Sequence, residues 1–380
     1  MLEKNINWVK IVHNPIIFKP ERIYRLFTGG LLMEKLFGFD NPQDGHFGEA
    51  WYASTVEAAY ANPNNMEKSK IKEGLSTVEF EREIKIFREL IKEFPEPLIG
   101  KSTLDEFGPT VPLLAKMLDS AVRHVVQCHP ATSFSRKYLN FPSGKDEAWV
   151  ILETRNNIET FPHLYLGFKK GITKKIFAPI LKEGNSKKLL NLLHKIPVSI
   201  GETYYVPAGT PHAFGAGIMA IEIQDPADFT FRAEKHCFGI NLSEAQRYLG
   251  VGFENTLDAF SYQGLTKEEL TNKYYFKPEI YFENNYVKQE IMLSGRPKHS
   301  FGIIKLSFKE KTKIELNDEF CIGIIIKGKG EIKTISQQTH ILPGNGLFFP
   351  AVLDELEVIP EGKLEMIICG IKDFPYIKIK

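Results

Sequence analysis

The sequence is poor in cysteine and contains no long apolar run. Four cysteines occur among the 380 residues, none of them in a C-x-x-C pair. They are Cys128, Cys237, Cys321 and Cys369. Such scattered thiols exclude a disulfide framework and a thiolate zinc ribbon, and they favour a reducing compartment. No apolar stretch approaches the ~18 residues of a bilayer span, and no cleavable leader pattern follows Glu3 and Lys4, so we expect a cytoplasmic protein without a membrane partner.

An excess of charge of either sign is also absent. Lysine and arginine together number 48, and aspartate and glutamate 47, so the formal net charge is +1. Without a basic surplus, nucleic acid is not expected as the main partner. Charged residues at 25% and hydrophobic residues at 43% are typical of a globular protein, and at ~150 residues per domain the length predicts two or three domains.

The abundant residue types favour a sheet-rich fold. Aromatic residues make up 12% of the chain, including 28 Phe and 14 Tyr, and such rings suit a half-buried pleated surface. Short apolar or alternating segments predict strands, and towards the C-terminus they recur about every ten residues, which is typical of a small barrel or sandwich. The predicted strands cover residues 148–152, 217–223, 303–308, 321–326, 346–349 and 364–368.

Two segments have helical patterns instead. In residues 76–94, apolar side chains recur three and four residues apart behind a capping box of Ser76 and Glu79, which predicts a helix that ends before Pro95. Residues 243–275 contain short amphipathic runs behind two further capping boxes, which predict a helical connector. These boxes pair Ser243 with Gln246 and Thr266 with Glu269.

A short sequence pattern occurs twice, once in the middle of the chain and once among the later predicted strands. The segment G-E-T-Y-Y-V-P runs from Gly201 to Pro207, and G-N-G-L-F-F-P runs from Gly344 to Pro350. Each has the form of a turn, one strand and a proline bend. The repeat predicts two related β-barrels joined by helices.

The first copy of the repeat continues into a recognisable motif. After Gly201 and Pro207 come Gly209 and His212, at the spacing of the second cupin motif up to its histidine. The proline and glycine turn the chain at a strand end, so that His212 on the next strand can face into the mouth of a barrel. An imidazole in that place is a candidate metal ligand.

Further candidate ligands occur upstream. Gln127 and His129 are two residues apart, so on an extended strand both side chains point to one face. Glu147 stands just ahead of an apolar strand and adds a carboxylate. Taken singly, Glu147 could be a surface charge and Gln127 a rim residue, but together with His212 they form a mixed nitrogen and oxygen shell. This set predicts one Zn²⁺ per chain, and iron or manganese would also fit.

The fold class that follows is mainly β, with two cupin-type jelly-roll barrels and helical insertions. The predicted N-terminal catalytic domain covers residues 1–240, with a helical insertion at about 66–97. A helical connector follows over 241–295, and a degenerate barrel over 296–380. After Pro350 this second copy reads A-V-L-D-E, which lacks the glycine and histidine of the motif, so we expect it to bind no metal and to pack against the first barrel.

Several sequence blocks of the N-terminal part form an ordered series. They are F-T-G-G-L-L (27–32), G-E-A-W-Y-A-S (48–54), P-L-L-A-K-M-L-D-S-A (112–121) followed by Q-C-H-P (127–130), G-K-D-E-A-W-V-I-L (144–152), Y-Y-V-P-A-G-T-P-H-A-F-G (204–215) and E-I-Q-D-P-A-D-F-T-F-R (222–232). In content and order these blocks resemble the type I phosphomannose isomerases, zinc-dependent cupins that interconvert mannose 6-phosphate and fructose 6-phosphate.

The resemblance implies roles for particular residues. It makes Gln127, His129, Glu147 and His212 the zinc ligands, the same four that their chemistry suggests. It implies Glu222 as the base of an enediol mechanism and Arg232 as the cation that stabilises the enediolate. Lys145 is a second cation near the metal, and Asp228 could orient Arg232. On spacing alone, Lys145 and Asp228 could equally be exposed loop charges.

Two departures from the family pattern concern the substrate. A small hydroxyl residue associated with phosphate binding commonly stands two places before the glutamine ligand, where this chain has Val125, and the segment after the arginine reads A-E-K-H-C-F-G. Arg123 and Lys235 are candidate replacements for phosphate binding. The expected substrate is therefore a hexose phosphate, with a free hexose as the alternative. A silent cupin that only binds an unphosphorylated sugar is the other function considered, and no sequence feature predicts an oligomeric state.

Overall fold

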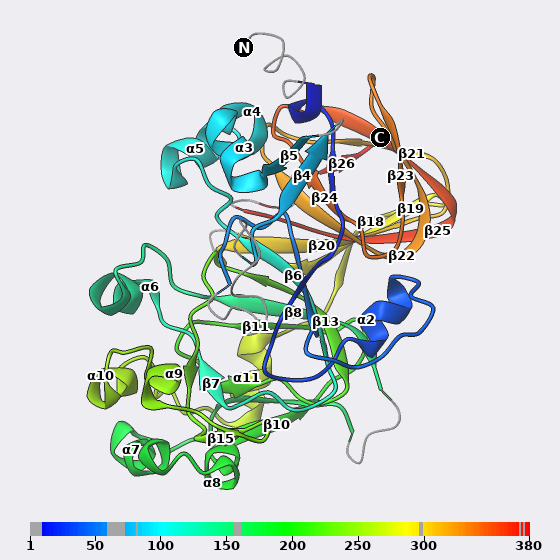
Figure 1. The fold of residues 1–380 in the computed structure, drawn as a ribbon. Helices are drawn as coiled ribbons and strands as arrows, with labels where there is room; N and C mark the ends of the chain where they lie inside the picture. Colours follow the sequence, from blue (N-terminus) through cyan, green and yellow to red (C-terminus); the bar gives the residue numbers. More distant parts are fainter. Residues whose placement is uncertain are drawn as a thin grey trace.

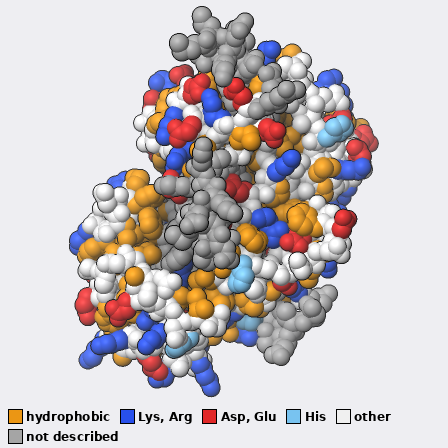
Figure 2. All heavy atoms as spheres, viewed as in Figure 1, with side chains coloured by type: hydrophobic (Ala, Val, Ile, Leu, Met, Phe, Trp, Pro, Cys, Tyr) orange, Lys and Arg blue, Asp and Glu red, His pale blue; other side chains and the backbone are white. Residues whose placement is uncertain are grey.

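The computed structural model describes residues 10–58, 73–80, 83–155, 161–295, 299–371, 374 and 377–380. Two sheet-rich halves are stacked on each other, with the C-terminal half at the top of Figure 1 and the middle of the chain below it. Within the described residues, no helix combines the length and apolarity needed to cross a membrane. Basic and acidic side chains are interspersed on the face shown in Figure 2, in keeping with the balanced net charge.

The lower half contains a seven-stranded sheet with the order β17-β11-β8-β13-β6-β3-β2. The predicted strands at 148–152 and 217–223 are confirmed as β8 and β13, its central members. The strands are β17 (Tyr275–Phe276), β11 (Thr203–Val206), β8 (Glu147–Thr154), β13 (Ile218–Gln224), β6 (Leu114–Ser120), β3 (Glu49–Tyr52) and β2 (Glu21–Ile23).

A five-stranded sheet with the order β10-β9-β12-β7-β14 packs against one face of the seven-stranded sheet. Their shared core contains Trp149 and Ile151 from the larger sheet and Leu166 and Phe214 from the side of the smaller one. The strands are β10 (Leu193–Pro197), β9 (His163–Phe168), β12 (His212–Ala213), β7 (Gln127–Cys128) and β14 (Phe231–Arg232). The space between these two sheets holds the candidate site.

A ten-stranded sheet forms the C-terminal half, and all four strands predicted in that region are confirmed within it. Its main path has the order β1-β24-β22-β25-β20-β19-β18, and β21, β23 and β26 pair off this path. The strands are β1 (Ile16–Phe18), β18 (Glu279–Glu283), β19 (Val287–Leu293), β20 (Phe301–Phe308), β21 (Thr312–Glu315), β22 (Cys321–Lys333), β23 (Gln338–Ile341), β24 (Gly346–Phe349), β25 (Glu355–Ile371) and β26 (Lys378–Ile379).

The two copies of the sequence repeat have the same local structure. Gly201 and Gly344 adopt φ values of 89° and 85°, a left-handed conformation that glycine adopts without strain. Each glycine leads into a four-residue strand, β11 or β24, that is buried along its whole length. The predicted order of turn, strand and proline bend is therefore confirmed in both halves.

Successive side chains of β13 point to opposite faces of the seven-stranded sheet, and this alternation shows how the two halves are held together. Ile221 and Ile223 point to a core shared with Ile303 and Phe348 of the C-terminal sheet, whereas Ala220 points to the core shared with the five-stranded sheet. Full burial of an isoleucine side chain contributes ~1.5–3 kcal/mol to folding. The seven-stranded sheet is thus buried on both faces, and the C-terminal half packs against the first as expected.

The predicted helix over residues 76–94 is wrong in its first part. Residues 77–80 and 83–86 form the hairpin strands β4 (Thr77–Phe80) and β5 (Glu83–Ile86), and a helix covers only Phe87–Glu93. The Ser76 hydroxyl does not cap a helix, because it accepts a hydrogen bond of 2.9 Å from the backbone N–H of Ser54. This contact with a distant segment overrides the local helical pattern. Residues 66–72 of the predicted insertion lie outside the described residues.

The described helices are short and lie on the outside of the sheets (Figure 1). A small hairpin of β15 (His236–Cys237) and β16 (Ile240–Asn241) follows the last strand of the five-stranded sheet. The helices are α2 (Leu31–Leu36), α3 (Phe87–Glu93), α4 (Pro95–Ile99), α5 (Lys101–Phe107), α6 (Thr132–Phe134), the π-helical turn η1 (Ser135–Leu139), α7 (Lys174–Glu183), α8 (Ser186–Asn191), α9 (Glu244–Tyr248), α10 (Phe253–Leu257) and α11 (Lys267–Tyr274).

The predicted connector contains three short helices, α9, α10 and α11, between residues 244 and 274. Both predicted capping boxes are present, at the N-termini of α9 and α11. The remainder, from residue 275 onwards, forms β17, β18 and β19, and the last two of these extend the C-terminal sheet. The helical part is therefore shorter than the predicted range of 241–295.

Replacing Thr266 with alanine is expected to lower the free energy of unfolding by ~1 kcal/mol. The Thr266 hydroxyl accepts a hydrogen bond from the backbone N–H of Glu269, and the Glu269 carboxylate accepts one from the backbone N–H of Thr266. Leu270 couples this helix to the core, because its side chain is buried. A urea titration measures the change, with Asn272→Ala on the exposed helix surface as the control. Equal stability of the two variants would contradict the prediction.

Candidate metal centre and active-site cavity

Two histidines and a glutamate meet between the two sheets of the lower half. His129, Glu147 and His212 each present a ligand atom, and these atoms all lie within 4.8 Å of one another. The Nε2 atoms of His129 and His212 are each 3.2 Å from a different oxygen of the Glu147 carboxylate. All three side chains are buried. Three of the four predicted ligands are therefore brought together.

Gln127, the fourth predicted ligand, lies beside the same cluster. Its strand β7 pairs with β12, where Gln127 is directly opposite His212. The Gln127 Nε2 atom is 3.2 Å from the His212 Nε2 atom. A half-turn of the amide group would exchange its nitrogen for its oxygen. An amide oxygen can therefore be presented to an ion in this cluster.

Hydrogen bonds to backbone carbonyls orient both imidazole rings. The Nδ1 atom of His129 lies 2.8 Å from the carbonyl oxygen of Phe229, and the Nδ1 atom of His212 lies 2.9 Å from that of Thr210. A carbonyl only accepts, so each Nδ1 carries the proton and each Nε2 presents a lone pair to the cluster. Burial lowers the pKa of both rings, to about 4 for His212, and so favours the neutral form that binds metals.

The cluster has the chemical character of a cation site. Its facing atoms are lone-pair donors, and the buried Glu147 Oε1 has no hydrogen-bond partner. Burial alone would raise the pKa of Glu147, but the Lys145 ammonium holds it well below its ordinary value. Two imidazole nitrogens, a carboxylate and an amide oxygen suit a divalent transition metal. The residues present therefore fit a bound metal ion.

The turn that precedes His212 is hydrogen-bonded to the backbone of the cluster residue His129. Gly209 has a φ of 80°, and its backbone N–H donates a hydrogen bond of 2.7 Å to the carbonyl oxygen of His129. The Asp146 carboxylate accepts hydrogen bonds from the Ala208 backbone N–H at 2.7 Å and from the Tyr205 hydroxyl at 2.5 Å. The glycine turn of the motif is thus bonded directly to the backbone of His129.

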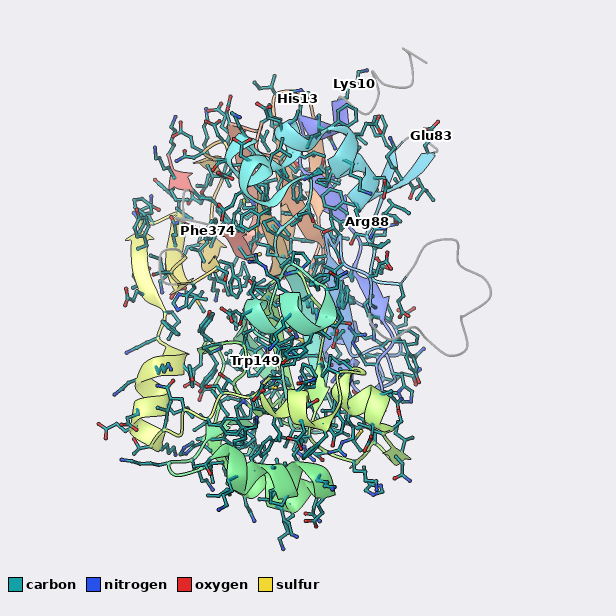
Figure 3. All side chains as sticks on the ribbon, turned by 90° about the vertical axis from the view of Figure 1, so that its left-hand side faces the viewer. Lys10, His13, Glu83, Arg88, Trp149 and Phe374 are labelled. Atoms are coloured by element: carbon teal, nitrogen blue, oxygen red, sulfur yellow. The ribbon has the colours of Figure 1, made fainter. Side chains whose placement is uncertain are left out.

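A cavity of about 280 Å³ adjoins the cluster, and Gln127, Lys145 and Glu147 form part of its wall. This volume is just below the ~300–1,000 Å³ typical of small-molecule sites. One group of lining side chains is charged: Arg25, Glu49, Lys116, Lys145, Glu147, Glu222, Asp228 and Arg232. Another group is apolar: Leu26, Phe27, Leu118, Val125, Trp149, Phe214 and Phe238. Figure 3 labels Trp149, which lies inside the sheet-rich lower half.

Lys145 and Glu222 both lie in the cavity wall close to the cluster. The Lys145 Nζ atom is 2.9 Å from Glu147 Oε2, 3.1 Å from His129 Nε2 and 3.4 Å from Glu222 Oε1. The interpretation of Lys145 as an exposed loop charge is wrong, because the side chain is buried. Burial raises the pKa of Glu222 to about 7, although Lys116 and Lys145 oppose the shift. A carboxyl group with such a pKa suits proton transfer near neutrality.

Arg232 and Asp228 also line the cavity. Arg232 lies on β14 directly opposite Gln127, and its Nη1 donates hydrogen bonds to the carbonyl oxygens of Thr230 and Gln246 at 3.3 and 3.0 Å. The Asp228 carboxylate is 3.5 Å from Arg25 and 3.7 Å from Lys116. The contacts that hold Asp228 therefore include two cations that the sequence interpretation did not consider.

Those two cations, Arg25 and Lys116, were missed together with their partner Glu49. Arg25 is 3.0 Å from Glu49, and Lys116 lies 3.9 Å from Glu49 and 3.8 Å from Glu222. Lys116 is only 2% exposed and sits 4.6 Å from the centre of the Trp51 ring. A lysine inside the apolar run P-L-L-A-K-M-L could have indicated this role, because a buried lysine needs compensating charges.

The two candidate phosphate ligands lie outside the cavity wall. Arg123 forms two hydrogen bonds to the buried Glu234 carboxylate, at 2.6 and 3.0 Å. It lines a neighbouring pocket of about 470 Å³, which shares Val125, Cys237 and Phe238 with the cavity. Lys235 is exposed and lines neither space. The guanidinium of Arg123 is thus already paired, and phosphate binding by either residue stays a prediction.

Known proteins are similar to the chain over nearly its whole length, although no protein-family model matches it. GmuF of Bacillus subtilis, named a probable mannose-6-phosphate isomerase, is 26% identical over 357 residues, or 93% of this chain and 98% of that protein. The mannose-6-phosphate isomerase of Streptococcus mutans is 25% identical over 353 residues, or 92% of this chain and 96% of that protein. The resemblance noted in the sequence motifs is therefore confirmed and extends through the C-terminal half.

The fold is shared with solved structures of such enzymes. The crystal structure of mannose 6-phosphate isomerase from Bacillus subtilis matches with a TM-score of 0.71 and 21% identity, covering 94% of this chain and 99% of that one. A variant of phosphomannose isomerase from Salmonella typhimurium matches with a TM-score of 0.66 and 15% identity, covering 94% of this chain and 100% of that one. The predicted mainly β, cupin-like fold is confirmed.

Proposed function

We propose that the chain is an aldose–ketose isomerase that interconverts mannose 6-phosphate and fructose 6-phosphate. The observation that carries the proposal is that the buried cluster of His129, Glu147 and His212 adjoins a small, strongly charged cavity, to whose wall it contributes Glu147. The similarity to mannose-6-phosphate isomerases in sequence and fold supports it. All four cysteines are free thiols, in keeping with an enzyme that works in the cytoplasm.

The proposed metal is zinc, held by Gln127, His129, Glu147 and His212. The nitrogen and oxygen donors of this set suit zinc as well as iron or manganese. When bound, the ion supplies Lewis-acid polarisation of neighbouring sugar oxygens. The remaining chemistry falls to charged side chains of the cavity wall.

The isomerisation moves protons between neighbouring atoms of the open-chain sugar. A base removes the proton from C2, a proton is delivered to C1, and the proton on O2 moves to O1 by way of an enediol. Glu222 is the proposed base, because its buried carboxyl lines the cavity and its pKa is raised to about 7. Arg232 and Lys145 are the proposed cations that stabilise the negative charge of the enediolate. The proposed part of Asp228 is to orient Arg232, while its own carboxylate lies 3.5 Å from Arg25 and 3.7 Å from Lys116.

The charge of the cavity favours a phosphorylated sugar over a free one. Among the described residues, the lining includes four cations (Arg25, Lys116, Lys145 and Arg232) and four carboxylates (Glu49, Glu147, Glu222 and Asp228). A divalent metal ion would therefore leave an excess of positive charge. A phosphate ester carries close to two negative charges at neutral pH, which would offset this excess.

Incubation of the zinc-loaded protein with mannose 6-phosphate in deuterated water is expected to produce fructose 6-phosphate with deuterium at C1. The label enters because the base exchanges part of the abstracted proton with solvent before it is delivered. NMR spectroscopy of the product measures both conversion and label. Absence of turnover with mannose 6-phosphate, mannose and other hexose phosphates would overturn the proposal and favour a protein that only binds a sugar.

A further inference from the structure

His124 is a buried polar side chain of the cavity that the proposed mechanism does not use. It lies between β6 and β7, it lines the cavity and it is 8% exposed. Its backbone N–H donates a hydrogen bond of 2.8 Å to the carbonyl oxygen of Phe214. The Nε2 atom of its ring, however, is buried without a hydrogen-bond partner.

An unpartnered buried nitrogen destabilises a protein, so its presence in a cavity wall needs an explanation. The imidazole of His124 packs against two phenylalanines, with ring centres 4.0 Å from Phe27 and 5.5 Å from Phe214. A leucine or phenylalanine would fill such a place without the cost of an unpaired polar atom. A ligand that hydrogen-bonds to the ring would supply the missing partner.

The ring is neutral and can donate a single hydrogen bond. Burial lowers the pKa of His124 to about 3, so the imidazolium form is not populated near neutral pH. A neutral imidazole retains one N–H group, which can bind an anionic oxygen without adding charge to the site. Hydrogen bonds to charged oxygens are stronger than those between neutral groups.

His124 is separated from the metal cluster by two aromatic side chains that are in contact with each other. From the ligand His212, the ring centre of Trp149 is 5.5 Å away, that of Phe214 is a further 5.3 Å away, and that of His124 a further 5.5 Å. A sugar whose C1 and C2 react beside the cluster would extend its far end along this wall. The far end of the proposed substrate carries the phosphate.

We infer that His124 binds the phosphate of the substrate, with its ring N–H donating to a phosphate oxygen. The inference rests on the proposed function and adds a specificity-determining residue to it. Two neighbouring residues do not offer a free donor for the phosphate. Val125 offers no hydroxyl group at the neighbouring position, and the Arg123 guanidinium is already paired with Glu234.

The test is a comparison of His124→Leu with the parent enzyme. Loss of the hydrogen bond is expected to raise KM for mannose 6-phosphate by about tenfold to a hundredfold, with kcat changed by less than about threefold. The inhibition constant of inorganic phosphate should rise with KM. The melting temperature should stay the same or increase, because an unpaired buried nitrogen is removed. His124→Gln, whose amide can donate from a similar position, should recover part of the loss.

A matched control is His163→Leu. His163 is 7% exposed, but its Nδ1 donates to the carbonyl oxygen of Phe161 and it does not line the cavity. Its KM should equal that of the parent enzyme. An unchanged KM in His124→Leu, or an equal loss of kcat/KM for mannose and mannose 6-phosphate, would overturn the inference. Failure of the proposed function would look different, because the parent enzyme itself would then show no turnover.

Discussion

Replacing His129 with alanine is expected to remove both the bound metal and the turnover. The substitution deletes one of two imidazole nitrogens that face Glu147 at 3.2 Å, so the ion loses a directional ligand. Changing a group that merely orients a metal ligand typically costs ~10–100-fold in affinity, and loss of the ligand itself should cost more. Elemental analysis after dialysis should give about one zinc per chain for the parent protein and close to none for the variant.

A control for this variant is His194→Ala. His194 hydrogen-bonds to the carbonyl oxygen of Leu265 through Nε2, at 2.8 Å, and lies outside the cluster. Its metal content and turnover should match those of the parent protein. If His129→Ala retained a full equivalent of metal, the ligand set would be wrong. If the parent protein bound no metal yet turned over mannose 6-phosphate, the metal centre itself would be excluded.

Replacing Glu222 with glutamine is expected to lower kcat by ~10²–10⁴-fold without changing the metal content. Glutamine keeps nearly the same shape but cannot accept a proton, so the abstraction at C2 loses its base. Exchange of deuterium into the sugar should fall by the same factor, because it reports the same step. Steady-state kinetics, product NMR spectroscopy and elemental analysis on one preparation measure the three quantities.

Glu365→Gln provides a matched substitution in the other half of the molecule. Glu365 is 7% exposed and Glu222 is 5% exposed, and Glu365 pairs with Lys305 and Lys363 far from the cavity. Its kcat should remain that of the parent enzyme. Retained turnover in Glu222→Gln would move the base to another carboxylate of the cavity wall. Loss of metal together with activity would instead make Glu222 a structural support of the cluster.

The sequence was sufficient to predict that His129, Glu147 and His212 come together, because its signals are local. The turn of Pro207 and Gly209 and the two-residue spacing of Gln127 and His129 each report a backbone geometry over a few residues. The same is true of the strands, whose apolar alternation is confirmed in β8 and β13. Capping boxes at Ser243 and Thr266 are confirmed for the same reason.

Features that depend on distant contacts could not be predicted in this way. A hairpin of β4 and β5 forms where the sequence has a helical pattern, and the residue just before it, Ser76, bonds to Ser54, 22 residues earlier in the chain. Arg25 reaches Glu49 and Asp228 only after three separate segments have come together. The unpartnered Nε2 atom of His124 could not be predicted either, because its burial results from packing against Phe27 and Phe214 on other segments. Sites of this kind can be recognised only once the tertiary structure is known.

The pairing of β1 with β24 has a consequence for how the chain folds. Ile16 lies opposite Phe348, so the first described strand completes a sheet whose other strands on the main path all come from residues after 278. During synthesis β1 emerges more than 300 residues before its partner β24. Contacts between such distant positions slow folding, since a long loop must close before they form. Until then the outer edge of β24 is unpaired, and an unpaired edge can join another chain. A newly made chain should therefore be most prone to aggregate in the interval before β1 pairs with β24.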